Sequence, residues 1–338
     1  ISKGDITVNA GSGGQTVTQG SQVDVPDSAP VITGSSTKNT VTINADKDQT
    51  ASVTLSGANI DVSNEVKAAV STTGEGNVSI ELDGDSTLKS GFTHAGLEKN
   101  NGGSLTIADE DKSGKLTVEG GNYGAGIGGG YNGTGSDITI SGGEVKATGG
   151  DFGAGIGGGE NGDGSGITIS GDARVNAQGG DGGAGIGGGY EGDGKDIKIT
   201  GGNVEATGGR QAAGIGGGWY KSGSGITISA GEVTATGGED GAGIGGGNRG
   251  NGSGITISGG EVIASSKNAG AGIGGGDEGN GEDITITGGE VKASSENVGA
   301  GIGGGYKGDG KRIKITGGIV DDASNIGGAG IGGGAGSL

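Results

Sequence analysis

The chain has 338 residues, of which 95 are glycine, 28 % are hydrophobic and 2 % are aromatic, and its formal net charge is −19. This composition excludes a wide globular core, and the acidic balance argues against nucleic acid as a partner, because nucleic-acid binding needs clustered lysine and arginine. The chain has no cysteine, which excludes disulfides and Cys-ligated zinc, and no apolar run is long enough to span a membrane.

Residues 1–94 contain short segments in which apolar and polar residues alternate, at 41–43, 51–55 and 78–82. Such alternation predicts half-buried strands. We expect this first region to form irregular coils and an N-terminal cap, since a stack of strands needs protection at its open edge. The second region, 95–338, begins with Ala95-Gly96-Leu97, a degenerate copy of the repeat that follows.

The sequence Ala-Gly-Ile-Gly-Gly-Gly then recurs eight times, with successive copies 29 or 30 residues apart. The copies start at Ala125, Ala154, Ala184, Ala213, Ala242, Ala271, Ala300 and Ala329. A fixed period of this size indicates a stacked solenoid. Collagen is excluded, because the chain has only two prolines and 29 is not a multiple of three. The chain stops inside its last repeat, so we expect a fragment of a longer protein.

Each coil offers three short strands separated by glycine-rich corners, as the unit at 154–183 illustrates. Alternation assigns to its interior Ala154, Ile156, Ile167, Ile169, Val175 and Ala177. Stacking these small aliphatic residues from coil to coil builds a continuous core. The predicted fold is therefore an all-β, right-handed parallel β-helix, because crossovers between parallel strands are overwhelmingly right-handed. Glycine makes an α-helical solenoid unfavourable.

The first residue after each of the first seven hexapeptides forms what we call the corner column. It comprises Tyr131, Glu160, Tyr190, Trp219, Asn248, Asp277 and Tyr306. With the neighbouring Tyr220, this corner holds five of the eight aromatic residues. Exposed rings pack on the apolar patches of sugars while carboxylates and amides bind hydroxyls, so we predict a carbohydrate-binding surface here, with Glu160 and Asn248 contributing polar groups. The alternative is that these side chains only cap the neighbouring coil.

The glycines of the hexapeptide suggest a second surface. If Ala154 and Ile156 point inward, Gly155 and Gly157 point outward and stack into a bare glycine strip. Such a strip allows close approach of an extended ligand or another protein surface. Tyr123 and Phe152, two residues before their hexapeptides, are then expected along the strip's edges. The favoured alternative is that these glycines meet tight corners or positive φ.

Two further columns of outward side chains are candidate functional surfaces. An outward ladder of threonine and serine begins at Thr139 and Ser141 and is similar to ice-binding surfaces, but Lys198 and Lys314 interrupt it. Carboxylates align at Glu232, Glu261 and Glu290, and the Gly-Asp-Gly turns add Asp163 and Asp193. Bound calcium would relieve repulsion within these columns, although a solvated acidic face is the favoured interpretation. No cofactor is required by the sequence, and calcium is left open.

An enzyme is not expected. The lone histidine, His94, has no repeated partner, so a nucleophilic site built on His or Cys lacks components. A carboxylate-dependent glycosidase or a calcium-dependent lyase-like site stays an alternative.

The segments 149–159 and 166–171 resemble repeat regions of secreted and cell-wall-anchored proteins of Gram-positive bacteria. Those regions are commonly described as similar to carbohydrate-binding domains, and their better-known relatives are right-handed β-helices that bind polysaccharides with calcium. The resemblance implies an extracellular, secreted or cell-wall-attached protein that binds a polysaccharide or a host or bacterial surface glycan. It covers 95–338 best and identifies no site residue. A structural stalk or protein-binding adhesin repeat is the alternative function.

Overall fold

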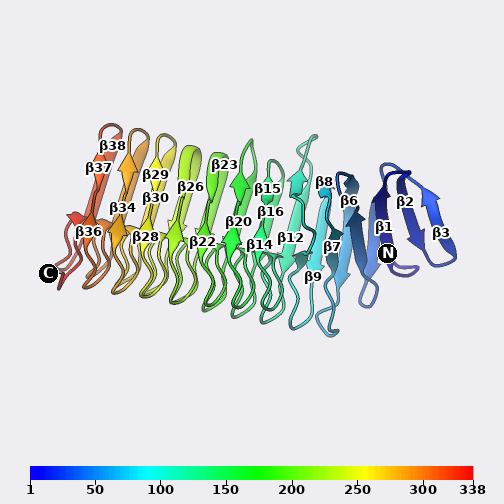
Figure 1. Ribbon diagram of the computed structural model, residues 1–338, viewed down its shortest axis with the longest axis horizontal. Helices are drawn as coiled ribbons and strands as arrows, with labels where there is room; N and C mark the ends of the chain where they lie inside the picture. Colours follow the sequence, from blue (N-terminus) through cyan, green and yellow to red (C-terminus); the bar gives the residue numbers. More distant parts are fainter. Residues whose placement is uncertain (338) are drawn as a thin grey trace.

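The computed structural model describes residues 1–337, and it shows a long stack of coils. In Figure 1 the coils follow one another along the long axis, from the blue N-terminal end to the red C-terminal end. The regular secondary structure of the described residues consists of β-strands, which confirms the predicted all-β class. Residues 1–337 include no helix that is long and apolar enough to cross a membrane.

The strands form three sheets that run along the stack. The first sheet, in which each hexapeptide supplies one short strand, contains β3 (Gln22–Pro26), β2 (Gly14–Gln19), β1 (Ile6–Gly11), β5 (Val41–Ala45), β7 (Val70–Gly74), β10 (Leu97–Lys99), β13 (Ile127–Gly128), β17 (Ile156–Gly157), β21 (Ile186–Gly187), β24 (Ile215–Gly216), β27 (Ile244–Gly245), β31 (Ile273–Gly274), β35 (Ile302–Gly303) and β39 (Ile331–Gly332).

The second sheet takes two strands from most coils, or one long strand that covers both positions. It contains β4 (Val31–Ser36), β6 (Thr50–Asp61), β8 (Asn77–Asp83), β9 (Asp85–Lys89), β11 (Leu105–Ala108), β12 (Lys115–Glu119), β15 (Ile138–Ile140), β16 (Glu144–Thr148), β19 (Thr168–Ile169), β20 (Arg174–Gln178), β23 (Lys198–Thr207), β26 (Thr227–Thr236), β29 (Thr256–Ile257), β30 (Glu261–Ser266), β33 (Thr285–Ile286), β34 (Glu290–Ser295), β37 (Lys314–Ile315) and β38 (Ile319–Ser324).

The third sheet consists of two-residue strands in the turn after each of the first seven hexapeptides. These are β14 (Gly135–Ser136), β18 (Gly164–Ser165), β22 (Gly194–Lys195), β25 (Gly223–Ser224), β28 (Gly252–Ser253), β32 (Gly281–Glu282) and β36 (Gly310–Lys311). The sequence predicts a turn for this segment, because its glycine-rich residues show no alternation of apolar and polar side chains. The three expected strands per coil are present, and this fourth one joins them.

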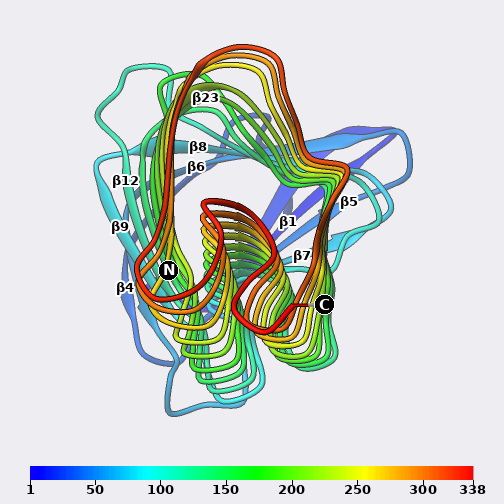
Figure 2. The ribbon, with the colours of Figure 1, turned by 90° about the vertical axis from the view of Figure 1, so that its left-hand side faces the viewer.

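Successive coils pair in parallel and in register, so that each residue lies on its counterpart one repeat away. Ile127 pairs with Ile156, and Val145 pairs with Val175. In Figure 2, viewed along the stack, the regular coils follow nearly the same path, while the blue and cyan N-terminal coils carry wider loops. The coil length of 29 or 30 residues therefore sets the architecture, as the period predicts.

The core is a column of small aliphatic side chains. Ile156, Ile167 and Ile169 are fully buried, and Val175 and Ala177 are at most 3 % exposed. Burial of each isoleucine or valine contributes about 1.5–3 kcal/mol relative to an exposed side chain. The predicted inward positions are thus confirmed.

At its N-terminal end the first sheet continues into a hairpin of two antiparallel strands, with β3 as the exposed edge strand. Strand β2 pairs antiparallel with β1, and β3 pairs antiparallel with β2. Strand β1 in turn pairs parallel with β5 of the next coil, where the coils begin. The hairpin lies where the sequence predicts a cap, and the three alternating segments of residues 1–94 lie in β5, β6 and β8 as expected.

Candidate functional site

Two turns of the repeat lie side by side on the outside of the stack. One is the corner column, and the other, the turn column, is the residue two positions before each hexapeptide. The amide of Tyr190 donates to the carbonyl of Phe152 at 2.8 Å, and the amide of Tyr131 donates to that of Thr93 at 2.7 Å. The same bond recurs in the other regular coils. The backbone therefore brings side chains about 37 residues apart into contact.

This arrangement gathers seven of the eight aromatic side chains into one row, which we call the aromatic ridge. Its members are Phe92, Tyr123, Tyr131, Phe152, Tyr190, Trp219 and Tyr220. Neighbouring ring centroids lie 4.8–5.5 Å apart, and most contacts are edge-to-face. The pairs Tyr123–Phe152 and Trp219–Tyr220 are stacked. Both geometries are favourable for aromatic pairs.

The ridge is partly open to solvent. Phe92 is 53 % exposed, Tyr131 is 51 % exposed and Tyr220 is 44 % exposed, whereas Tyr190 and Trp219 are half-buried. The indole Nε1 of Trp219 is buried without a hydrogen-bond partner among residues 1–337. The exposed rings are therefore the ones that can meet a ligand, and the half-buried rings support them.

The predicted position of Tyr123 and Phe152 was wrong, because these turn-column rings contact rings of the corner column instead of edging a glycine strip. The glycine strip itself does not exist as a surface. Gly155 and Gly157 are buried, and a Cβ on Gly157 would come within 1.9 Å of the carbonyl oxygen of Gly187. Gly157 has a φ of 135°, a backbone conformation that other residues rarely adopt. Tight packing between coils requires these glycines, so no partner can dock on them.

The remaining members of the corner column differ from the ridge. Asn248 is buried, and its amide donates to a carboxylate oxygen of Asp240 at 3.2 Å. Tyr306 stands apart from the ridge, with the ammonium of Lys307 at 4.8 Å from its ring centroid. Glu160 is half-buried beside Tyr123, and burial followed by the charge of Glu191 raises its pKa. The structure thus unites four of the five predicted aromatic residues, and it separates Tyr306 from them.

The acidic columns are aligned as predicted. Glu232 pairs with Glu261, and Glu261 pairs with Glu290, on adjacent strands. The Asn203 amide donates to Glu232 at 2.7 Å, and the ammonium of Lys292 lies 3.0 Å from Glu290. These partners offset part of the repulsion among the three glutamates without a bound metal ion.

The aspartates of the Gly-Asp-Gly turns share a lysine. The ammonium of Lys195 lies 2.9 Å from Asp163 and 3.0 Å from Asp193. No group of three or more His, Asp or Glu side chains in residues 1–337 is arranged to hold a metal ion. Calcium binding at these columns stays a prediction.

The outward hydroxyl ladder is also in register, with Thr139 on Thr168. Lys198 follows on the next coil and Lys314 near the C-terminal end, so the ladder is interrupted where the sequence indicates.

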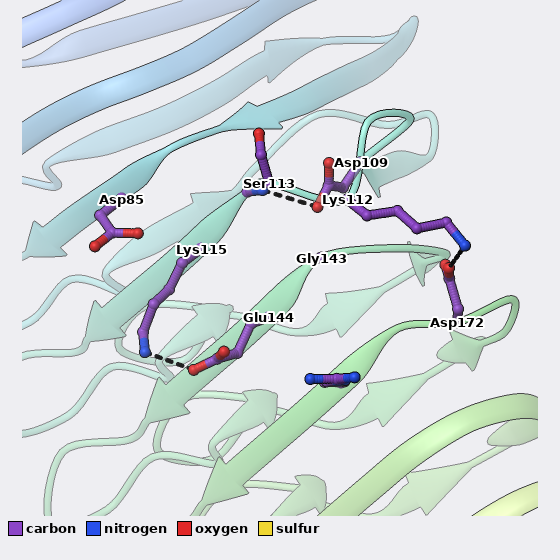
Figure 3. Close-up of a pocket in the computed structure, with 10 residues that line it drawn as sticks. Asp85, Asp109, Lys112, Ser113, Lys115, Gly143, Glu144 and Asp172 are labelled. Atoms are coloured by element: carbon purple, nitrogen blue, oxygen red, sulfur yellow. Dashed lines mark hydrogen bonds and ion pairs between the residues drawn. The ribbon is translucent and has the colours of Figure 1, made fainter.

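A charged pocket of about 380 Å³ lies on the second sheet, near the loop between β11 and β12. As Figure 3 shows, Lys115 pairs with Glu144 and Lys112 pairs with Asp172. One carboxylate oxygen of Asp109 accepts the amide of Gly114 at 2.9 Å, and the other is buried without a partner in the described part of the chain. Because the cations and anions largely neutralise each other, the pocket offers no dominant charge to a ligand.

A second pocket, which we call the junction pocket, lies at the first end of the aromatic ridge. It has a volume of about 260 Å³ and is lined by Thr93, His94, Glu98, Asn100, Gly130, Tyr131 and Gly133. The imidazole Nδ1 of His94 lies 2.8 Å from a carboxylate oxygen of Glu98, and the Asn100 amide donates to the other oxygen at 2.8 Å. Sequence reasoning missed this cluster, although the change from Gly-Gly-Gly to Glu-Lys-Asn at 98–100 could have signalled it.

The electrostatics of the junction pocket favour a charged pair. The hydrogen bond to Glu98 raises the pKa of His94 against the opposing effect of burial. Burial alone would raise the pKa of Glu98, but the hydrogen bonds from His94 and Asn100 and the charge of His94 outweigh it, so this pKa is lowered. Both shifts stabilise the imidazolium–carboxylate form.

The Beta helix repeat family model matches residues 138–160, 167–190, 197–219, 226–248, 255–277 and 284–306. Each matched segment ends at the corner-column residue, so the family repeat and the coil of the structure coincide. Comparisons with curated proteins and with solved structures found no match. The matched repeats and the parallel register of the sheets identify this chain as a parallel β-helix repeat protein.

Proposed function

We propose that this β-helix binds a polysaccharide that lies along the aromatic ridge, outside the cell and without cleaving it. The observation that carries the proposal is the continuous row of seven rings, three of them about half exposed. A globular core does not need these rings, because the aliphatic column fills the interior of each coil. Exposed aromatic rows of this kind mark interaction sites.

The spacing of the ridge suits an extended chain of sugar rings. Adjacent coils are about 4.8 Å apart, which is comparable to the length of one pyranose unit. Polar side chains line the ridge at Asn122 and Asp151, whose amide and carboxylate groups lie 3.1 Å apart. Rings packing on the sugar faces and polar groups at their edges form the usual combination for sugar recognition.

A glycan array tests the proposal, and substitutions that the repeat already carries at the same positions test the site. Tyr131→Asn follows Asn248, and Tyr220→Asn follows Asn132 and Asn161, which share its positive φ. Loss of one stacking ring is expected to weaken binding about tenfold. Tyr306→Asn, in the same column but outside the ridge, is the matched control and should bind normally.

Thermal unfolding of each variant should stay close to that of the unsubstituted protein, because Tyr131 and Tyr220 are exposed. If no array glycan binds, with or without calcium, the proposal fails. A reducing-sugar assay and an unsaturated-product assay on the bound glycan test whether the role is indeed non-catalytic.

A structural stalk is the second candidate function. It is favoured by the uninterrupted backbone ladder of the first sheet, which runs from β1 to β39 through coils with and without the ridge. A stalk predicts that Tyr131→Asn and Tyr220→Asn change no binding property at all.

A further inference from the structure

The coil at 95–100 departs from the repeat in a way that creates a cavity. In a regular coil, the amide of Ala154 donates to the carbonyl of Gly158 at 2.9 Å. In this coil, the amide of Ala95 donates instead to the carboxylate of Glu98 at 3.0 Å. The carboxylate of Glu98 therefore replaces a glycine carbonyl as the acceptor of this hydrogen bond. Glu98 is only 7 % exposed and lines the junction pocket.

The pocket combines fixed polar groups with an exposed ring. Glu98 holds His94 and Asn100 by the two hydrogen bonds described above, and this leaves His94 Nε2 and Asn100 Oδ1 without partners among residues 1–337. Tyr131, which contacts Tyr123 of the ridge at 5.5 Å between ring centroids, forms one wall. Polar groups that converge beside an aromatic face are typical of a small-molecule site.

The charges around the pocket favour a neutral ligand. Glu98 and His94 compensate each other, and the adjacent Lys99 is buried with its ammonium bound to the carbonyl of Asn101 at 2.7 Å. A ligand carboxylate would meet the buried Glu98, and a ligand ammonium would compete with His94 for it. Hydroxyl groups, which both donate and accept, match His94 Nε2 and Asn100 Oδ1.

We propose that the junction pocket binds one neutral pyranose unit, the terminal unit of the polysaccharide on the ridge. This inference rests on the proposed function. Tyr131 packs against the sugar ring, His94 and Asn100 hydrogen-bond to its hydroxyls, and Glu98 is a positioning residue that fixes both. The ridge continues from this pocket for four coils to Tyr220, or about 19 Å.

The chain provides two independent spectroscopic reporters for the test. His94 is its only histidine and lies in the pocket, while Trp219 is its only tryptophan and lies near the other end of the ridge. The experiment titrates the full chain with cellotetraose, xylotetraose, mannotetraose and chitotetraose, and then with the corresponding polymers. The imidazole proton resonance of His94 and the fluorescence of Trp219 are followed in parallel.

The expected result is that at least one tetrasaccharide shifts the His94 resonance saturably, and that its polymer also changes the Trp219 fluorescence. A change at Trp219 with an unmoved His94 resonance overturns the terminal pocket but leaves the ridge intact. A change at His94 alone supports the pocket and contradicts binding along the ridge. If neither the His94 resonance nor the Trp219 fluorescence changes, both the terminal pocket and binding along the ridge are contradicted.

Substitutions separate binding from folding. Asn100→Ala is expected to weaken tetrasaccharide binding about tenfold, because one hydrogen bond to a hydroxyl is lost. Tyr220→Asn is the matched control, since it lies at the far end of the ridge and should weaken only polymer binding. His94→Gln keeps a polar group in the pocket and should bind better than His94→Ala. If all four variants bind the tetrasaccharide as tightly as the unsubstituted protein does, the assignment of the pocket is overturned.

Discussion

The coils that carry the ridge and the coils from Ala242 onward share the same core but differ on the outside. Ile156 and Ile273 are both fully buried, and Gly157 and Gly274 have nearly the same positive φ. At the paired corner and turn columns, however, Phe152 and Tyr190 place two rings 5.5 Å apart, whereas Asp240 and Asp277 place two carboxylates. One scaffold thus supports a row of aromatic rings in one half and a pair of aspartates at the equivalent position in the other.

The shared core should respond identically in both halves, and this gives the largest expected effect. In Gly216→Ala and Gly274→Ala, the new Cβ would lie 2.0 Å from the carbonyl oxygen of the next coil, at a positive φ. Clash and backbone strain together cost about 4 kcal/mol or more. Denaturant unfolding followed by circular dichroism measures the loss.

Gly13→Ala is the control for these variants, because Gly13 is exposed and nothing lies within 4 Å of the added Cβ. It should leave stability almost unchanged. A stable Gly274→Ala protein would show that the two halves do not share one core requirement.

The second effect concerns the acidic counterpart of the ridge. Burial first, and then the charges of Asp240 and Glu278, raise the pKa of Asp277, and one of its oxygens is buried without a partner in the described residues. We expect Asp277→Asn to stabilise the protein by at most about 1 kcal/mol at neutral pH, because it removes a partly buried charge whose penalty is reduced by solvent screening. The exposed Asp181→Asn should change little.

The pH dependence of this effect has a definite sign. Because the folded-state pKa of Asp277 lies above its ordinary value of 3.8, the penalty is complete above the raised pKa and disappears as the pH falls below about 3.8. Thermal unfolding of both proteins across this range should therefore converge at low pH. A constant difference at all pH values would contradict the explanation.

A smaller effect is expected at the first end of the ridge. The raised pKa of His94 means that its pairing with Glu98 is fully stabilising below about pH 6.5 and is lost as the pH rises through the folded-state pKa. The lowered pKa of Glu98 means that its contribution is lost as the pH falls below about 4.5. The melting temperature of the unsubstituted protein should exceed that of His94→Gln most between these limits. An advantage that grows above pH 8 would contradict the pairing.

The smallest expected change in stability concerns outward side chains of the second sheet, where the two halves of the stack also differ. Lys115 stands between Asp85 and Glu144, whereas Glu261 stands between Glu232 and Glu290. Glu261→Lys should therefore stabilise the protein by about 0.5 kcal/mol, and less at high salt.

If calcium binds this column, added calcium raises the melting temperature of the unsubstituted protein more than that of Glu261→Lys. Equal responses would argue against a calcium site there.

The sequence predicts the core well because inward residues follow a strict period. Ile167 and Ile169 alternate with polar residues, so their direction could be inferred without coordinates. The same rule failed at Gly157, where a positive φ breaks the alternation that it assumes. The meeting of Phe152 with Tyr190 also escaped prediction, because it depends on how two turns of different coils bond to each other.

The turn that joins the two second-sheet strands of a coil varies in length, while the strands on either side of it keep their register. It comprises Asp109–Gly114 in one coil and Ser141–Gly143 in the next, yet Leu116 still lies on Val145. A coil can therefore gain or lose residues at this turn without disturbing its neighbours, and the longer loop already contributes to the charged pocket. Coil length therefore changes at this turn, away from the corner column, and a coil can carry a longer loop there while its strands keep their register.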